Sequence, residues 1–345
     1  MVRRVRRGRA LFVLAVLMAA VGAGVVAAAR WWDTPLEGLS APRVIEIAPG
    51  QRVTQIGDQL AVAGVLDLPW LFVWQARVRG QASHLRAGEY ALTAGMTPRA
   101  LAALLVSGKV VLHPVTLVEG WTAAEALQAL HREDFLRATV QAADAAAARS
   151  AVAPTAGSVE GWLFPDTYLV PKGTTDVEVL KLAHARMQNK LAEIWSRRAE
   201  GLPLQSPYEA LTLASIIEKE TGNSDERAHI AAVFINRLRK GMRLQTDPTV
   251  IYGLGEHYTG AIHKKDLTTD TPWNTYTRDG LPPTPIALPG LAALTAAVHP
   301  SRSDDLYFVA SGQGDGRHTF SATLAAHNAA VAGYVSRMRQ KDKSR

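Results

Sequence analysis

The chain has 345 residues, enough for two or three compact units, because domains usually comprise roughly 100 to 200 residues. Its net charge of +7 is concentrated at the two ends: residues 1–30 hold six arginines, residues 337–345 add a net four positive charges, and residues 31–336 therefore carry about −3. This distribution argues against a nucleic-acid-binding protein, which would need a basic patch on its folded part. The absence of cysteine excludes disulfides, thiol nucleophiles and zinc–thiolate sites.

An uncharged apolar segment, residues 10–29, follows the basic N-terminus. As a helix rising about 1.5 Å per residue it would span roughly 30 Å, the thickness of the hydrocarbon core of a bilayer. We therefore predict a basic cytoplasmic tail at 1–9 and a transmembrane helix at 10–30, with the rest of the chain outside the cytoplasm. The alternative is a cleaved signal peptide, but its apolar region would normally comprise only roughly 7 to 15 residues.

Residues 31–42 are predicted to form a linker, and residues 43–115 to form a small α+β subdomain. The stretch RVIEIAPGQRVTQIGDQL predicts a strand, a turn at Pro49-Gly50 and a helix. The stretch EYALTAGMTPRALAALL repeats this order, with a helix that begins at Thr97-Pro98. Such units are typical of ordinary α+β packing and also of glycan-binding modules of the lysin-motif type.

Residues 116–157 are predicted to form a connecting region. Its second part, residues 138–157, is rich in alanine and poor in large apolar side chains, which indicates a surface helix or linker. From Ser158 onward aromatic residues, prolines and glycines alternate with helical segments. We predict a mixed α+β catalytic domain at 158–336, followed by a basic tail at 337–345.

The stretch SPYEALTLASIIEKETGN predicts a helix with Ser206 as N-cap, a capping box completed by Glu209, and an end at Gly222. At about 100° per residue, Glu218 lies on or at the edge of the apolar face, whereas Lys219 and Glu220 point away from it. Burial would raise the pKa of Glu218 and keep it protonated near neutrality, as a general acid requires. Helix geometry alone equally allows a solvated or paired glutamate near a helix end.

A second helix is predicted from a capping Asp225 to Gly241. Two polar loops follow it. The first contains Gln245, Thr246 and Asp247, and the second is a proline-rich loop that contains Asn274, Tyr276 and Arg278. Such groups can bind sugar hydroxyls and amides, and rigid loops lose little entropy when they bind extended ligands. Asp247 could equally cap a turn.

Five stretches in this order carry a resemblance to a known family: VEGWLFPDTY, LASIIEKET, VFINRLRKGMRLQTDPTVIYG, NTYTRDGLPPTPIALPG and HTFSATLAAHN. Together they resemble the endolytic murein transglycosylase (YceG-like) family over roughly residues 40–336. The resemblance implies a single-pass inner-membrane lyase, with a lysin-motif-like subdomain and a periplasmic domain that cuts peptidoglycan glycan strands internally. It implies Glu218 as the catalytic acid and base. It also implies five substrate-binding residues in the cleft: Glu160, Gln245, Asp247, Asn274 and Tyr276.

In the implied reaction, Glu218 protonates the oxygen between N-acetylmuramic acid and N-acetylglucosamine, and then removes the proton of the muramic C6 hydroxyl. That hydroxyl attacks C1 of the same sugar and leaves a 1,6-anhydro end. A hydrolase normally needs two carboxylates, whereas this reaction needs only one. No cofactor or metal is expected, and the histidines show no paired-ligand spacing. The expected partners are glycan strands, the membrane and peptidoglycan synthases, for the trimming or termination of nascent strands.

Two other functions remain open at the level of sequence. One is a muramidase that uses Asp247 or Asp166 as a second carboxylate. The other is a non-catalytic wall-binding scaffold of the synthesis machinery, which would depend on the repeat-like region and the membrane helix.

Overall fold

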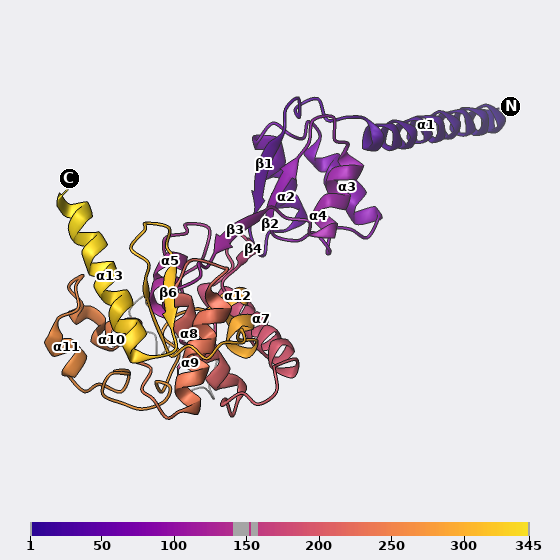
Figure 1. Ribbon diagram of the computed structural model, residues 1–345. Coiled ribbons are helices and arrows are strands. Elements are labelled where there is room, and N and C mark those ends of the chain that lie inside the picture. Colours follow the sequence, from indigo (N-terminus) through magenta and orange to yellow (C-terminus); the bar gives the residue numbers. More distant parts are fainter. Residues whose placement is uncertain (1, 141–151, 153–157, 344–345) are drawn as a thin grey trace. The chain divides into compact units, whose positions relative to one another are not determined.

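The computed structural model describes residues 2–140, 152 and 158–343, and the chain divides into an N-terminal unit, Met1–His113, and a C-terminal unit, Pro114–Arg345. Helices and small two-stranded sheets occur together, so the fold is α+β, as the sequence predicted (Figure 1). Of the predicted alanine-rich segment 138–157, residues 141–151 and 153–157 lie outside the described residues.

The N-terminal helix α1 (Val2–Asp33) contains the predicted apolar segment and extends beyond it at both ends. Its part Leu11–Asp33 is 23 residues long, has a mean hydropathy of 2.6, and buries none of its most apolar stretch against the rest of the protein. Large apolar side chains such as Phe12 and Leu17 are more than half exposed. By length and composition this helix can cross a membrane.

The two predicted strand–turn–helix passes form the core of the N-terminal unit. Strand β1 (Arg43–Ile47) pairs antiparallel with β2 (Gly88–Leu92), with Ile45 opposite Tyr90. The helices α2 (Val53–Val62), α3 (Pro69–Val78) and α4 (Pro98–Ser107) pack around this pair. Thr97 caps α4 by accepting a hydrogen bond of 3.1 Å from the Ala100 amide, which is the helix start that the sequence predicted.

The segment predicted as a linker, residues 31–42, contributes three side chains to this core. Trp32, Leu36 and Leu39 are at most 4% exposed. The Trp32 ring lies 5.8 Å from the ring of Phe72 in α3. The last residue of α1, Asp33, also accepts a bond of 2.9 Å from Arg99 of α4. The end of α1 is therefore packed into the N-terminal unit.

The C-terminal unit is mainly helical. Near its start, β3 (Leu112–Thr116) pairs with β4 (Thr167–Pro171), and α5 (Ala123–Leu130) and α7 (Asp176–Ser196) share a hydrophobic cluster with them. The main core lies between α8 (Pro207–Glu220), α9 (Arg227–Arg239) and α12 (Leu291–Val298), which lie side by side (Figure 1). The remaining elements are α10 (Asp247–Leu254), the 3-10 helix η1 (Gly255–His257), α11 (Lys264–Thr268), β5 (Tyr307–Ala310), β6 (His318–Ser321) and α13 (Leu324–Lys343).

Both helices predicted in the catalytic domain form, as α8 and α9, but their N-terminal capping differs from the expectation. Ser206 caps α8 by accepting from the Glu209 amide at 3.3 Å, yet the Glu209 carboxylate accepts from the Gln205 amide, so the predicted capping box does not form. Helix α9 starts after Glu226, and the predicted cap Asp225 is wrong. The Glu226 carboxylate instead binds the amide and ring of His318, because a tertiary contact competes with local capping.

Candidate active site

Glu218 occupies the last turn of α8 and has a side chain that is only 5% exposed. Its two carboxylate oxygens have different partners. Oε1 accepts from Nη2 of Arg227 at 3.2 Å, and Oε2 accepts from the amide of Gly290 at 2.9 Å. Arg227 is the first residue of α9, and Gly290 is the N-cap of α12. The ends of three helices therefore converge on one carboxyl group.

Opposing effects act on the pKa of Glu218. Burial raises it, while the Gly290 amide and the Arg227 guanidinium lower it, and the nearby Glu119 carboxylate raises it again. The net result is a pKa above the ordinary value for glutamate. A raised pKa favours the protonated form that a general acid needs, and the two donors stabilise the carboxylate after it gives the proton away.

Gly290 leaves room for a second acid next to Glu218. A Cβ atom at this position would lie only 1.9 Å from Oε1 of Glu119, so the Glu119 carboxylate occupies the space above the glycine. The segment around Glu119 is held in place through backbone bonds: Gly120 donates to the Leu288 carbonyl at 2.9 Å, and Leu288 donates to the Trp121 carbonyl at 2.7 Å. The Lys219 ammonium also donates to the Gly120 carbonyl at 3.1 Å.

Glu220 was expected to point away from the apolar face of α8, and it does, but its carboxylate is enclosed by other segments and not free in solvent. Burial raises the pKa of Glu220 to about 7, against the lowering effect of a hydrogen bond from Thr246, and neighbouring Asp247 raises it further while His318 lowers it. The Thr246 hydroxyl donates directly to Oε1 of Glu220. The end of α8 thus carries two buried carboxyl groups, each on its own side of the helix.

The predicted loop residues Asp247 and Tyr276 lie together. The Tyr276 hydroxyl donates to Oδ1 of Asp247 at 2.6 Å. Burial raises the pKa of Tyr276, and the hydrogen bond to Asp247 raises it further. Thr246 binds Glu220, and the adjacent Asp247 binds Tyr276. These four residues therefore form one polar cluster at the start of α10.

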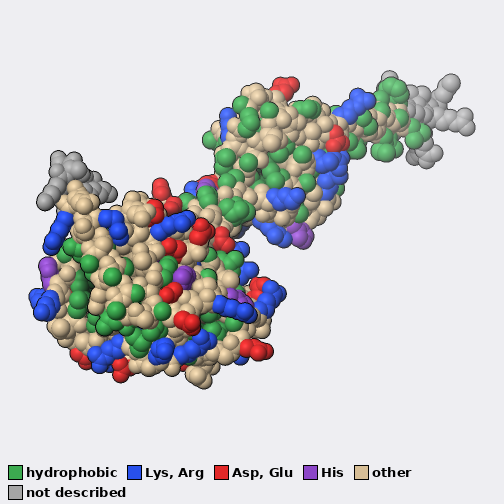
Figure 2. Space-filling model, viewed as in Figure 1, with side chains coloured by type: hydrophobic (Ala, Val, Ile, Leu, Met, Phe, Trp, Pro, Cys, Tyr) green, Lys and Arg blue, Asp and Glu red, His purple; other side chains and the backbone are tan. Residues whose placement is uncertain are grey.

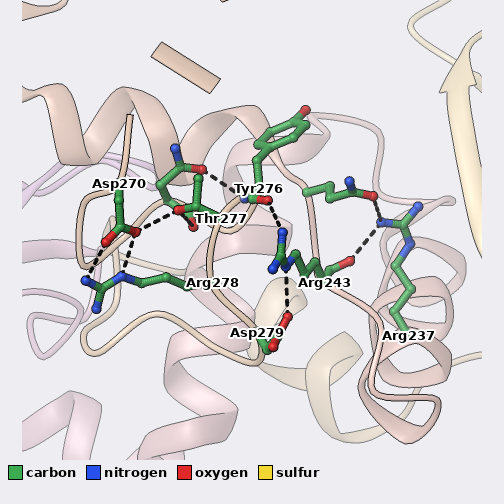
Figure 3. Close-up of polar contacts among 9 residues, drawn as sticks. Arg237, Arg243, Asp270, Tyr276, Thr277, Arg278 and Asp279 are labelled. Carbon is green, nitrogen blue, oxygen red and sulfur yellow. Dashed lines mark hydrogen bonds and ion pairs between the residues drawn. The ribbon is translucent and has the colours of Figure 1, made fainter. Parts of the chain in front are cut away.

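Gln245 and Asn274 form hydrogen bonds that hold the two loops in place. Gln245 has a positive φ of 51° and accepts from the Arg237 guanidinium at 3.2 Å. Asn274 is 1% exposed; its amide donates to the carbonyls of Asp266, Leu267 and Thr269, and its oxygen accepts from the Tyr276 amide. Figure 3 shows this loop with its outer ion pairs, Asp270 with Arg278 and Asp279 with Arg243. Asn274 therefore has few bonds left to offer a ligand.

Glu160 is buried, with 5% exposed surface. Its oxygens accept from the Ala123 amide at 3.0 Å and from the Tyr252 hydroxyl at 3.2 Å. Burial raises the pKa of Glu160 to about 7, although both hydrogen bonds lower it. The next residue, Gly161, has φ +77°, and a Cβ atom there would lie 2.4 Å from Pro285 of the proline-rich loop. Glu160 thus joins α5 and α10 beneath that loop.

The sequence interpretation missed Arg227, Glu119 and Tyr252. Arg227 had a local signal, because it follows Glu218 by nine residues and lies in the first turn of the second predicted helix. Glu119 and Tyr252 had no such local signal, because their roles depend on contacts between distant segments of the chain. Across the described ranges 2–140, 152 and 158–343, no group of three or more histidine and acidic side chains is placed to hold a metal ion.

The chain thus combines an N-terminal apolar helix, an α+β fold and a buried glutamate held by an arginine and a helix N-cap. The chain belongs to the YceG-like family, whose model matches residues 45–333. It is 32% identical over 314 residues to the endolytic murein transglycosylase of Bacillus subtilis, covering 86% of both chains. It is 30% identical over 326 residues to the protein of that name from Streptococcus pneumoniae, covering 85% of this chain and 58% of the relative.

A solved structure supports the same relationship. The crystal structure, at 2.6 Å, of a yceG-like protein from Listeria monocytogenes matches with a TM-score of 0.52 and 30% sequence identity. The match covers 84% of this chain and 99% of that chain.

Proposed function

We propose that this protein is a membrane-anchored lytic transglycosylase that cuts peptidoglycan glycan strands internally between N-acetylmuramic acid and N-acetylglucosamine. The names of the Bacillus and Streptococcus relatives support the substrate and the reaction class. The observation that carries the proposal is Glu218, a carboxyl group with a buried side chain, a raised pKa and two stabilising donors.

The chemistry needs one group that acts first as acid and then as base. Protonated Glu218 gives its proton to the glycosidic oxygen as the C1–O bond breaks. The resulting carboxylate is stabilised by Arg227 and by the Gly290 amide. It then accepts the proton of the muramic C6 hydroxyl as that oxygen bonds to C1, so no water is consumed and the glutamate returns to its starting state. The product carries a 1,6-anhydro end.

The test is digestion of purified peptidoglycan by the full chain and by Glu218→Gln, with mass spectrometry of the fragments. Since general acid–base catalysis contributes about 100- to 10,000-fold, we expect the variant to lose at least about 100-fold in rate. Glu209→Gln is the matched control, a glutamate in the first turn of the same helix. Unchanged cleavage by Glu218→Gln, with binding to the wall retained, would favour the scaffold function instead.

A muramidase is the second candidate, because Glu220 and Asp247 place further carboxyl groups near the end of α8. Asp166, the other predicted partner, is 43% exposed and forms an ion pair with Arg186. The ends of the fragments distinguish the two reactions. Reducing ends instead of anhydro ends, together with loss of activity in Glu220→Gln or Asp247→Asn, would replace the transglycosylase with a hydrolase.

We further propose that α1 anchors the protein in the inner membrane with its C-terminal unit in the periplasm, near the synthases that make new strands. The length and hydropathy of Leu11–Asp33 and the arginines before it support this topology. In cells that make an untethered form, the distribution of glycan chain lengths should change. An unchanged distribution, with the untethered enzyme active on purified peptidoglycan, would count against a role for the anchor in strand trimming.

A further inference from the structure

Helix α3 carries an exposed apolar stripe. Trp70, Trp74 and Val78 are 66%, 47% and 65% exposed. At about 100° per residue these side chains lie within an arc of about 80° on one face of the helix. The opposite face, with Phe72 and Ala76, is fully buried in the N-terminal unit. Two exposed tryptophans on one helix face indicate a binding surface rather than a random distribution.

This stripe lies beside the C-terminal end of α1. The Gln75 side chain donates to the Ala28 carbonyl of α1 at 3.2 Å. Gln75 lies about 60° around α3 from Val78, so the stripe borders the side of α3 that contacts α1. Figure 1 shows the two helices adjacent at this point. Ala28 lies near the C-terminal end of the apolar helix Leu11–Asp33. The stripe on α3 therefore lies beside the last turns of that helix.

Basic side chains predominate around the stripe, although Asp33 at the end of α1 lies near Arg79. Residues 68–88 contain three arginines and a histidine but no aspartate or glutamate. Arg77 and Arg79 are exposed, and the Arg79 guanidinium lies 5.4 Å from the centre of the Trp32 ring. Figure 2 shows lysine and arginine side chains gathered on this unit close to the largely apolar surface of α1. Anionic lipid headgroups complement such a surface.

We propose that the exposed face of α3 binds the outer surface of the membrane that α1 crosses, with Trp70, Trp74 and Val78 in the headgroup region. The inference rests on the proposed membrane anchor. Tryptophan is favoured at this depth because its ring is apolar while its N–H can still bond to water or headgroups. A helix with an apolar stripe and basic flanks is typical of helices that lie in the interface. The contact with Ala28 favours lipid over glycan as the occupant.

Site-directed spin labelling tests the proposal cleanly, because the chain has no native cysteine. The full chain is labelled singly at Trp74→Cys, at Val16→Cys in α1, and at Val44→Cys, a 57% exposed apolar position on β1 that serves as the matched control. Each variant is reconstituted in vesicles of phosphatidylethanolamine and phosphatidylglycerol. Collision rates are then measured with oxygen, which concentrates in lipid, and with a nickel chelate, which stays in water.

We expect the ratio of oxygen to nickel collisions at position 74 to exceed that at position 44 by at least about threefold, and the ratio at position 16 to be higher still. An aqueous label at position 74 with an embedded label at position 16 would overturn the α3 contact but leave the anchor. An aqueous label at position 16 would overturn both. A label at position 74 that is immobilised by added peptidoglycan sacculi and not by lipid would assign the stripe to glycan. Val78→Cys repeats the measurement if Trp74→Cys does not fold.

Discussion

The Arg227 guanidinium lies 3.2 Å from the carboxylate of Glu218, and the two side chains are 12% and 5% exposed. At this burial the pair is weakly screened by solvent, so its effect on proton binding is larger than that of a surface ion pair. The positive charge favours the carboxylate and opposes the effect of burial on the pKa of Glu218.

Removing this charge in Arg227→Met should raise the pKa of Glu218 further. Because the protonated form acts as the acid, activity is present below the pKa of Glu218 and falls as pH rises through it. The alkaline limb of the profile of kcat/KM against pH should therefore move to higher pH in the variant. Arg197→Met, which removes an exposed arginine paired with Glu193, should leave the limb in place. An unmoved limb in Arg227→Met would show that another group sets it.

Glu160 should make folding stability depend on pH. Its pKa rises from 4.5 to about 7 on folding, so its stabilising contribution is complete below pH 4.5 and is lost as pH rises through 7. A shift of this size corresponds to about 3 kcal/mol. In Glu160→Gln the free energy of unfolding of the full chain in detergent should lose this contribution to its pH dependence between about pH 5 and 8, while Glu220, whose pKa is also raised to about 7, keeps its own contribution. The variant Glu200→Gln, at an exposed position, should keep the wild-type dependence; equal slopes in both variants would contradict the assignment.

Asn274 should act as a structural residue of the proline-rich loop. Asn274→Ala leaves the carbonyls of Asp266, Leu267 and Thr269 without their shared donor, which should cost about 2 to 3 kcal/mol of unfolding free energy. Hydrogen exchange should accelerate in residues 264–278. Asp270→Asn, which weakens an exposed ion pair in the same loop, should cost less than about 1 kcal/mol. A variant as stable as the wild type but defective in glycan binding would instead make Asn274 a ligand.

Tyr276→Phe should separate substrate binding from chemistry. The change removes the hydroxyl that donates to Asp247, in the polar cluster beside Glu220. If this cluster holds the glycan, KM should rise several-fold while kcat changes little, which is the pattern for loss of uniform binding. Tyr90→Phe removes a hydroxyl bonded to the Arg86 carbonyl in the N-terminal unit and should leave KM unchanged. A fall in kcat alone would place Tyr276 in the chemical step.

Local patterns in the sequence were enough to predict α1, α2, α4, α8 and α9, the first two strands and the burial of Glu218, but not α7, α12 or α13. They did not predict the burial of Glu220, because a helical wheel assumes one buried face. In α8 eight consecutive residues, 210–217, are buried, so the helix is enclosed on more than one face before its last turn. Local patterns also could not predict that Gly290 is a partner of Glu218. Gly290 lies 72 residues away along the chain, and only tertiary packing brings it to the carboxylate.

The burial of Trp32 and the bond between Asp33 and Arg99 have a mechanical consequence. A freely jointed tether would let α1 spin in the bilayer without disturbing anything outside it. Here the Trp32 indole is buried in the core of the N-terminal unit, and Asp33 is bonded to Arg99 of α4. No flexible linker therefore separates α1 from the rest of this unit. When α1 turns about its axis, the N-terminal unit turns with it.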